Sequence, residues 1–210
     1  MKPVRLHRTT TNAVIHALDQ IFGEGRYADK VIEKTLKQNS KWGARDRRFI
    51  AETTYDVVRW YLLLRIVARA KEDEYWKILG AWFVLNGDVL PPWDEFRGVK
   101  AGDIKSRYEE VKQTRRYRES IPDWLDELGA RELGEHWDKE LTALNEAASV
   151  VLRTNSLKIS KRDLIGALQE EDVQVYTLDA YPEALVLEKR QNIFTLDAFK
   201  NGYFEVQDAA

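Results

Sequence analysis

Val150-Val151-Leu152-Arg153-Thr154 is the stretch at which the hydrophobic pattern of this 210-residue chain changes. Before it, apolar residues recur at intervals of three and four, the spacing that buries one face of an α-helix. From it onward, short apolar runs of strand length alternate with turns and one amphipathic segment. We therefore expect a helical domain over residues 1–147 and a small α+β domain over residues 148–210, with residues 120–147 able to pack with either.

The pattern also predicts the individual elements. In the α+β part we expect strands over 150–154, 173–178, 184–187 and 203–206, and a helix capped by Ser160. In the helical part, Thr9 to Thr11 offer N-cap hydroxyls to a first helix that ends at Gly23 and Gly25. Ser120-Ile121-Pro122-Asp123 is typical of a capping box that opens a later helix. The other expected helices cover residues 27–38, 44–70 with a break near Trp60, 75–85, 104–118 and 132–147.

Composition excludes several classes of function. The chain has no cysteine, which rules out disulfides, thiolate zinc sites and cysteine nucleophiles. Its three histidines are not in a metal-binding spacing, and no segment has the roughly 20 apolar residues of a membrane span. We see no signal peptide, so we expect a cytoplasmic protein with no metal and no membrane partner.

One glycine motif has the spacing of a dinucleotide fingerprint: Gly23-Glu24-Gly25-Arg26-Tyr27-Ala28. Because no strand precedes it, a turn after a helix is the better interpretation.

Charge is distributed unevenly along the chain. Residues 1–120 carry 24 Lys and Arg against 17 Asp and Glu, a net +7, whereas residues 121–210 carry 9 against 18, a net −9. Two basic stripes at helical spacing account for much of the excess: Lys30, Lys34, Lys37 and Lys41, then Arg45, Arg48, Tyr55 and Arg59. Such stripes are able to neutralise phosphates, or they are simply solvated helix faces; the spacing leaves both interpretations open. Of the seven tryptophans, Trp42 and Trp93 are the two candidates for surface stacking, and the others are expected in the core.

Several motifs together carry a family resemblance. Residues 43–52 (GARDRRFIAE) resemble the third-helix signature of NusB-like RNA-binding domains. Residues 120–125 (SIPDWL), 144–146 (LNE), 152–158 (LRTNSLK) and 199–209 (FKNGYFEVQDA) resemble, in the same order, the Sun/Fmu/RsmB family of S-adenosylmethionine-dependent RNA (cytosine-5) methyltransferases. These motifs are distributed over most of the chain.

The resemblance implies a fold and a set of site residues. It implies an all-α NusB-like helical bundle followed by a small α+β, ferredoxin-like domain that leads into a Rossmann-like domain binding S-adenosylmethionine. By resemblance, Arg153, Asn155 and Lys158 hold RNA near the catalytic cleft. For Arg153 and Asn155, a structural role at the exit of the strand is an equally weighted alternative. Leu157 is expected in the core.

The chain departs from the family at the catalytic residues. Family members use two cysteines and a glycine-rich cofactor loop, and this chain has neither. We therefore expect no catalysis and no cofactor in this chain, with S-adenosylmethionine bound by a further catalytic domain that would be its intramolecular partner. The expected function is RNA binding, on ribosomal RNA, in the N-terminal portion of such an enzyme. A stand-alone NusB-like adaptor for RNA or protein and a plain protein-interaction module stay open as alternatives.

Overall fold

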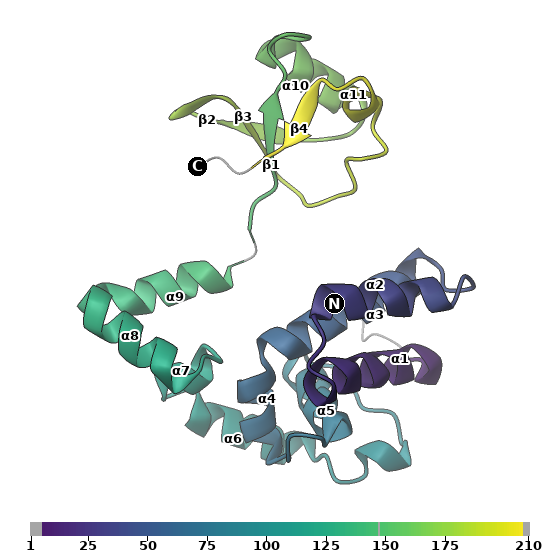
Figure 1. Ribbon diagram of the computed structural model, residues 1–210, viewed down its shortest axis with the longest axis vertical. Helices are drawn as coiled ribbons and strands as arrows, with labels where there is room; N and C mark the ends of the chain where they lie inside the picture. The colour runs from purple at the N-terminus through teal and green to yellow at the C-terminus, as the bar shows by residue number, and fades with distance from the viewer. Residues whose placement is uncertain (1–5, 147, 208–210) are drawn as a thin grey trace. The chain divides into compact units, whose positions relative to one another are not determined.

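The computed structural model describes residues 6–146 and 148–207, and the chain divides into two compact units (Figure 1). The first comprises Met1–Asn145 and the second Glu146–Ala210. The helical unit contains α1 (Arg8–Leu18), α2 (Ala28–Gln38), α3 (Ala44–Arg59), α4 (Tyr61–Ala68), α5 (Tyr75–Leu85), α6 (Ala101–Val111), α7 (Arg115–Arg118), α8 (Asp123–Leu133) and α9 (Trp137–Asn145). A π-helical turn over Asp19–Gly23 extends α1, and two short 3-10 turns precede α6 and α9.

Helix α5 lies at the centre of the helical unit. Its sequence, YWKILGAWFVL, is apolar on nearly every side, and a helix of that kind is stable only when other helices surround it. It contacts α1, α3, α4 and α6. Ile78, Leu79 and Phe83 are fully buried in the same core as Ile50 of α3 and Leu64 of α4. This core gives α2 and α3 a fixed support.

The break predicted near Trp60 is present, and it separates α3 from α4. The hydroxyl of Ser120 binds the first turn of α4. The chain leaves helical geometry at Trp60, and α4 restarts at Tyr61. The N–H of Leu63, in the first turn of α4, donates to the Ser120 Oγ at 3.4 Å. Ser120 is buried and has a positive φ of 51°. The predicted capping box is therefore wrong: α8 begins after Pro122 with no side-chain cap, because the Ser120 hydroxyl is used by α4.

Two other sequence expectations at helix ends have different outcomes. Thr10 and Thr11 do not cap α1, because both hydroxyls donate backward to the carbonyl of His7 from within the first turn. Ser160 does cap its helix as predicted, since its Oγ accepts from the N–H of Asp163 at 3.1 Å.

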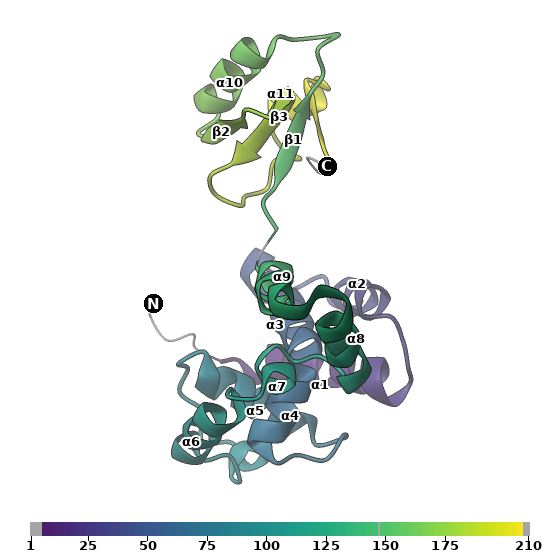
Figure 2. The same cartoon turned by 90° about the vertical axis from the view of Figure 1, so that its left-hand side faces the viewer.

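Helices α8 and α9 form a hairpin that follows α7 (Figure 2). Ile121, Trp137 and Leu141 form its small core. Gly129 of α8 lies directly against the indole of Trp137, so that a β-carbon there would overlap the ring. The absence of a side chain at Gly129 is what lets the two helices approach.

The second unit is a four-stranded antiparallel sheet with two helices. In chain order it contains β1 (Val151–Thr154), α10 (Lys161–Glu170), β2 (Val175–Leu178), β3 (Tyr181–Leu187), α11 (Asp197–Lys200) and β4 (Phe204–Val206). The strand order is β2-β3-β1-β4, and every pairing is antiparallel. This βαββαβ arrangement is ferredoxin-like. Leu152, Leu185 and Phe204 share one core with Leu164 of α10 and Ala198 of α11, so both helices cover the same face of the sheet.

The predicted fold class is thus confirmed as a helical bundle followed by a small α+β domain. The side chain of Leu157 contradicts its expectation: it is 96% exposed and lies in the turn after β1 rather than in the core. Trp42 and Trp93 pack partly buried against the core, whereas Trp124 is the exposed tryptophan. Over residues 6–146 and 148–207, no helix is long and apolar enough to cross a membrane.

Candidate nucleic-acid interface

Six of the predicted phosphate-binding residues lie on one continuous part of the chain. Helix α2 carries three of them, α3 carries two, and one lies in the short connection between these helices, which pack against each other. The apolar face of α2, with Val31, Ile32 and Thr35 buried, turns its lysines outward. All six side chains are exposed. We call this set the basic surface: Lys30, Lys34, Lys37, Lys41, Arg45 and Arg48.

Three cations of the basic surface have carboxylate partners. Lys30 lies 3.5 Å from Asp29, Lys37 lies 2.6 Å from Glu33, and Arg48 lies 3.8 Å from Glu52. Hydrogen bonding and charge from Lys37, with a further contribution from Lys30, lower the pKa of Glu33. These are solvent-exposed pairs, so each is weak and easily exchanged for another anion.

The other three cations are unpaired. Among the residues that the structure describes, the side chains of Lys34, Lys41 and Arg45 form no ion pair. Lys30, Lys34 and Lys37 also line a shallow depression on α2 together with Glu33 and Gln38. Six cations against three carboxylates leave the basic surface with a net charge of about +3, which favours a polyanion.

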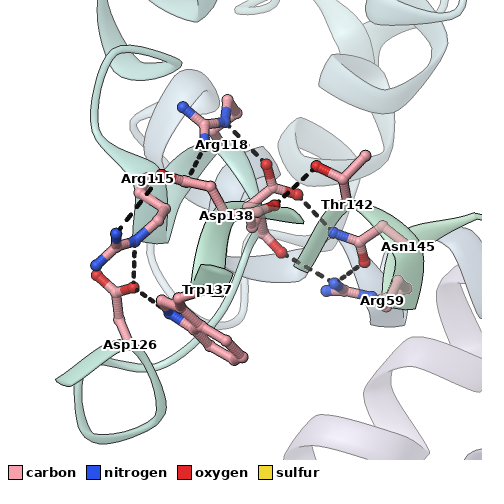
Figure 3. A network of polar contacts seen from close by, with 9 residues as sticks. Arg59, Arg115, Arg118, Asp126, Trp137, Asp138, Thr142 and Asn145 are labelled. Carbon is pink, nitrogen blue, oxygen red and sulfur yellow. Dashed lines mark hydrogen bonds and ion pairs between the residues drawn. The ribbon is translucent and has the colours of Figure 1, made fainter. Parts of the chain in front are cut away.

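Arg59 is placed differently from the other predicted residues. Its guanidinium donates to the carbonyls of Glu119 (3.0 Å) and Ser120 (3.1 Å) and bonds the side-chain amide oxygen of Asn145 (Figure 3). It also lies over the ring of Trp60, 4.8 Å from the centroid. Burial lowers the pKa of Arg59, against the effect of Glu119. Its donors are used within the helical unit, and the structure does not bring it to the basic surface.

Arg59 is part of a polar network that holds the α8–α9 hairpin to the rest of the helical unit (Figure 3). Arg115 bonds Asp126 at 2.6 Å, and the indole N–H of Trp137 donates to the same carboxylate at 2.9 Å. Burial raises the pKa of Asp126, but these two hydrogen bonds and the charge of Arg115 outweigh it, and the net pKa is lowered. Arg118 bonds Asp138 at 2.9 Å. The sequence showed only a charged helix here, because the acidic partners lie far along the chain.

The three predicted residues of the α+β unit lie around the turn after β1. Asn155 Nδ2 donates to the carbonyl of Gly202, and Lys158 Nζ donates to that of Asn201, each at 2.9 Å. Both side chains therefore support the turn before β4, which agrees with the structural interpretation of Asn155. Arg153 Nη1 lies 3.4 Å from Gln207 Oε1, in a weak contact.

Of these three residues, Arg153 has the weakest hydrogen bond within the chain, so its side chain is the one most accessible to a ligand. It points to the face of the sheet opposite to the helices, because its neighbours Leu152 and Thr154 face the core. Glu205 is directly opposite on β4. Arg153, Asn155, Leu157 and Glu205 line a depression at this edge, so a carboxylate accompanies the cation.

Over residues 6–146 and 148–207, the side chains form no arrangement typical of a cofactor or metal site. The sheet is antiparallel and has no crevice at the carboxyl ends of parallel strands, where a Rossmann-like domain binds its cofactor. Within the described part of the chain, no group of three or more His, Asp or Glu side chains is placed to hold a metal ion. No catalytic step is assigned to these residues.

Comparison with known proteins identifies relatives. Residues 121–194 match the family model described as "Methyltr_RsmF/B-like, ferredoxin-like domain". The match begins at the start of the α8–α9 hairpin, which the structure places with the helical unit. A probable ribosomal RNA small subunit methyltransferase B of Coxiella burnetii is 26% identical over 87% of this chain and 50% of its own length. The ribosomal RNA small subunit methyltransferase B of Citrobacter koseri is 21% identical over 92% of this chain and 52% of its own length.

A solved structure has a similar fold. The crystal structure of PH0851 superimposes with a TM-score of 0.61 at 19% identity, over 98% of this chain and 54% of that one. The chain therefore spans about half the length of the relatives it matches. These matches confirm the resemblance seen in the sequence: they are consistent with an N-terminal region of the Sun/RsmB family, and the relatives that they identify are named ribosomal RNA small subunit methyltransferase B.

Proposed function

We propose that this chain is the RNA-binding portion of a ribosomal RNA (cytosine-5) methyltransferase, which positions RNA for an S-adenosylmethionine-dependent catalytic domain. The observation that carries the proposal is the basic surface, where Lys34, Lys41 and Arg45 are exposed and unpaired among the described residues. Phosphate contacts of this kind supply affinity and position without reading sequence. The names of the relatives agree with an RNA substrate.

The two units contribute unequally in this proposal. Residues 146–210 carry 7 Lys and Arg against 11 Asp and Glu, a net −4 that repels RNA, and both predicted cations of the α+β unit, Arg153 and Lys158, already contact polar groups of the chain. Arg153 is the residue of this unit that we propose to contact RNA, beside a catalytic domain that supplies compensating charge. Binding by this chain alone is therefore weak, salt-sensitive and carried by the helical unit.

Charge reversal tests this function. In the full chain, Lys34→Glu, Lys37→Glu, Arg45→Glu and Arg48→Glu together should abolish binding of a fluorescein-labelled fragment of small-subunit ribosomal RNA, measured by anisotropy. The control makes the same change of net charge elsewhere, at Lys100, Lys105, Lys139 and Lys189, which are exposed. Unchanged affinity in the first variant, or equal losses in both, would refute the placement on α2 and α3.

A second candidate, a stand-alone adaptor that binds a protein as well as RNA, is favoured by one observation. Trp124 and Leu128 lie one helical turn apart on α8 and are 64% and 38% exposed, which gives an adaptor an apolar docking face. Trp124→Ser with Leu128→Ser separates the candidates. Under the adaptor function, the pair of substitutions should remove crosslinks to a partner protein in cells while leaving RNA binding intact; under the methyltransferase function, crosslinks to unrelated proteins should be absent from the start.

A further inference from the structure

A pocket in the helical unit is lined by aromatic rings, one carboxylate and the guanidinium of Arg118, whose Nη2 also bonds Asp138 at 2.9 Å. Trp60 contributes from the α3–α4 break, Trp82 and Asn86 from the end of α5, and Tyr108 from α6. Asp56 of α3 lies at the same pocket, and leucines of α4 and α5 complete its apolar wall. The guanidinium of Arg59 lies over Trp60 and holds that ring in place. Asp56 and Trp82 belong neither to the basic surface nor to the polar network of Figure 3, whereas Arg118 joins the pocket to that network.

Two polar groups of this pocket, Asp56 and Asn86, have unused hydrogen-bonding capacity, whereas Arg118 pairs with Glu119 and Asp138. Among the residues that the structure describes, the carboxylate of Asp56 has no hydrogen bond or ion pair. Burial, and to a smaller extent the charge of Glu52, raises the pKa of Asp56. Asn86 Nδ2 donates to the carbonyl of Trp82 at 2.9 Å, which leaves its Oδ1 as an acceptor. The Asp56 side chain is partly open to solvent at the pocket, so it is accessible to a ligand that brings N–H groups.

The pocket is connected to the basic surface along one face of α3. Arg45, Arg48, Glu52 and Asp56 follow at intervals of three and four, so they share a face. With a rise of about 1.5 Å per residue, Asp56 lies about 12 Å along the helix from Arg48. A strand whose phosphates contact Arg45 and Arg48 therefore has its next bases within reach of the pocket.

We propose that this pocket binds an unstacked guanine base of RNA, an inference that rests on the proposed RNA-binding function. Aromatic rings accept the face of any base, and the carboxylate supplies the selectivity. Guanine presents two neighbouring donors, N1–H and the N2 amino group, to the two oxygens of Asp56. Uracil presents a single N3–H between two carbonyls, which the carboxylate repels. Adenine and cytosine each place a ring acceptor beside their amino group.

Base selectivity in a short RNA tests this inference. The full chain should bind a uridine octamer with one central guanosine about tenfold more tightly than the all-uridine octamer, as a bidentate base contact does. Asp56→Asn should remove this preference by weakening the guanosine-containing RNA alone. Asp103→Asn on α6, exposed and outside the pocket, is the control with the same charge change. If Asp56→Asn strengthens both octamers equally, the carboxylate only repels phosphates and the inference is wrong.

A mononucleotide titration separates this inference from the proposed function. Guanosine monophosphate should quench tryptophan fluorescence, uridine monophosphate should not, and Asp56→Asn and Trp82→Phe should each diminish the quenching. RNA binding without a guanosine preference and without this quenching overturns the pocket and leaves the basic surface intact. Asp56-dependent quenching in a chain that binds no RNA overturns the proposed function and retains the pocket as a guanine site.

Discussion

Replacing Lys34, Lys41 and Arg45 by glutamine removes the three unpaired cations of the basic surface and leaves its three ion pairs in place. The three side chains are exposed and form no hydrogen bond or ion pair with any described residue, so the variant should unfold at the same temperature as the unchanged chain. Any change in the RNA affinity of this variant then reports on electrostatics alone.

The structure fixes the size of the effect. Three cations free to neutralise phosphates give a plot of log affinity against log salt concentration a slope of about −2 for single-stranded RNA, from roughly −0.7 per contact. Affinity should thus fall about 20-fold between roughly 50 and 200 mM salt. The triple variant should show a clearly shallower slope, because each remaining cation of the surface has a carboxylate within 4 Å that a phosphate must first displace.

Anisotropy of a labelled single-stranded RNA at five salt concentrations measures both slopes. The control replaces Lys100, Lys105 and Lys139 by glutamine, which changes the net charge equally at exposed positions away from α2 and α3. A triple variant that keeps the full slope would show that the phosphates lie elsewhere. Equal reductions in variant and control would show that only the overall charge matters.

The remaining predictions concern stability. Gly129→Ala should destabilise the helical unit by about 1–3 kcal/mol in denaturant unfolding, because its β-carbon overlaps the Trp137 ring; Gly102→Ala, with open space around it, should not. Arg59→Ala should lower the thermal unfolding temperature, because it removes hydrogen bonds worth about 1–3 kcal/mol. The salt dependence of RNA affinity should stay unchanged. A weaker salt dependence at unchanged stability would instead support the predicted role of Arg59 in RNA binding. Asp56→Asn should stabilise the fold at pH 7 by up to about 1 kcal/mol, since the site is part-exposed. The raised pKa of Asp56 favours the protonated carboxyl in the folded chain, so this gain should shrink as the pH falls toward 3.8 in paired melts of the two proteins, and a constant gain would contradict it.

Local signals predicted much of the fold. The helix expected over residues 75–85 is α5, the break near Trp60 separates α3 from α4, and Ser160 caps α10. Each of these follows from interactions within a few residues, which periodicity and capping rules describe.

The failures share one cause, which is that spacing identifies a face but not what covers it. Ser120 lies in a sequence typical of a helix cap, yet its hydroxyl accepts a hydrogen bond from the N–H of Leu63, 57 residues away. Leu157 has a core-type side chain, but it lies in a turn that no described residue of its own unit covers. By spacing, Arg59 belongs to the basic stripe of α3. Its guanidinium is instead hydrogen-bonded to Glu119, Ser120 and Asn145, which lie much later in the chain. The pocket at Asp56 likewise depends on α3, α5 and α6 meeting, and no local motif marks it.

Lysine acetylation with and without bound ribosomal RNA tests the central claim most directly, because mass spectrometry reads each lysine of the full chain separately. The account predicts that a small-subunit ribosomal RNA fragment protects Lys30, Lys34, Lys37 and Lys41 on the exposed face of α2 and its following turn, while Lys100, Lys105 and Lys189 keep reacting as in the free protein. Protection confined to lysines outside the basic surface, or spread evenly over all of them, would contradict it.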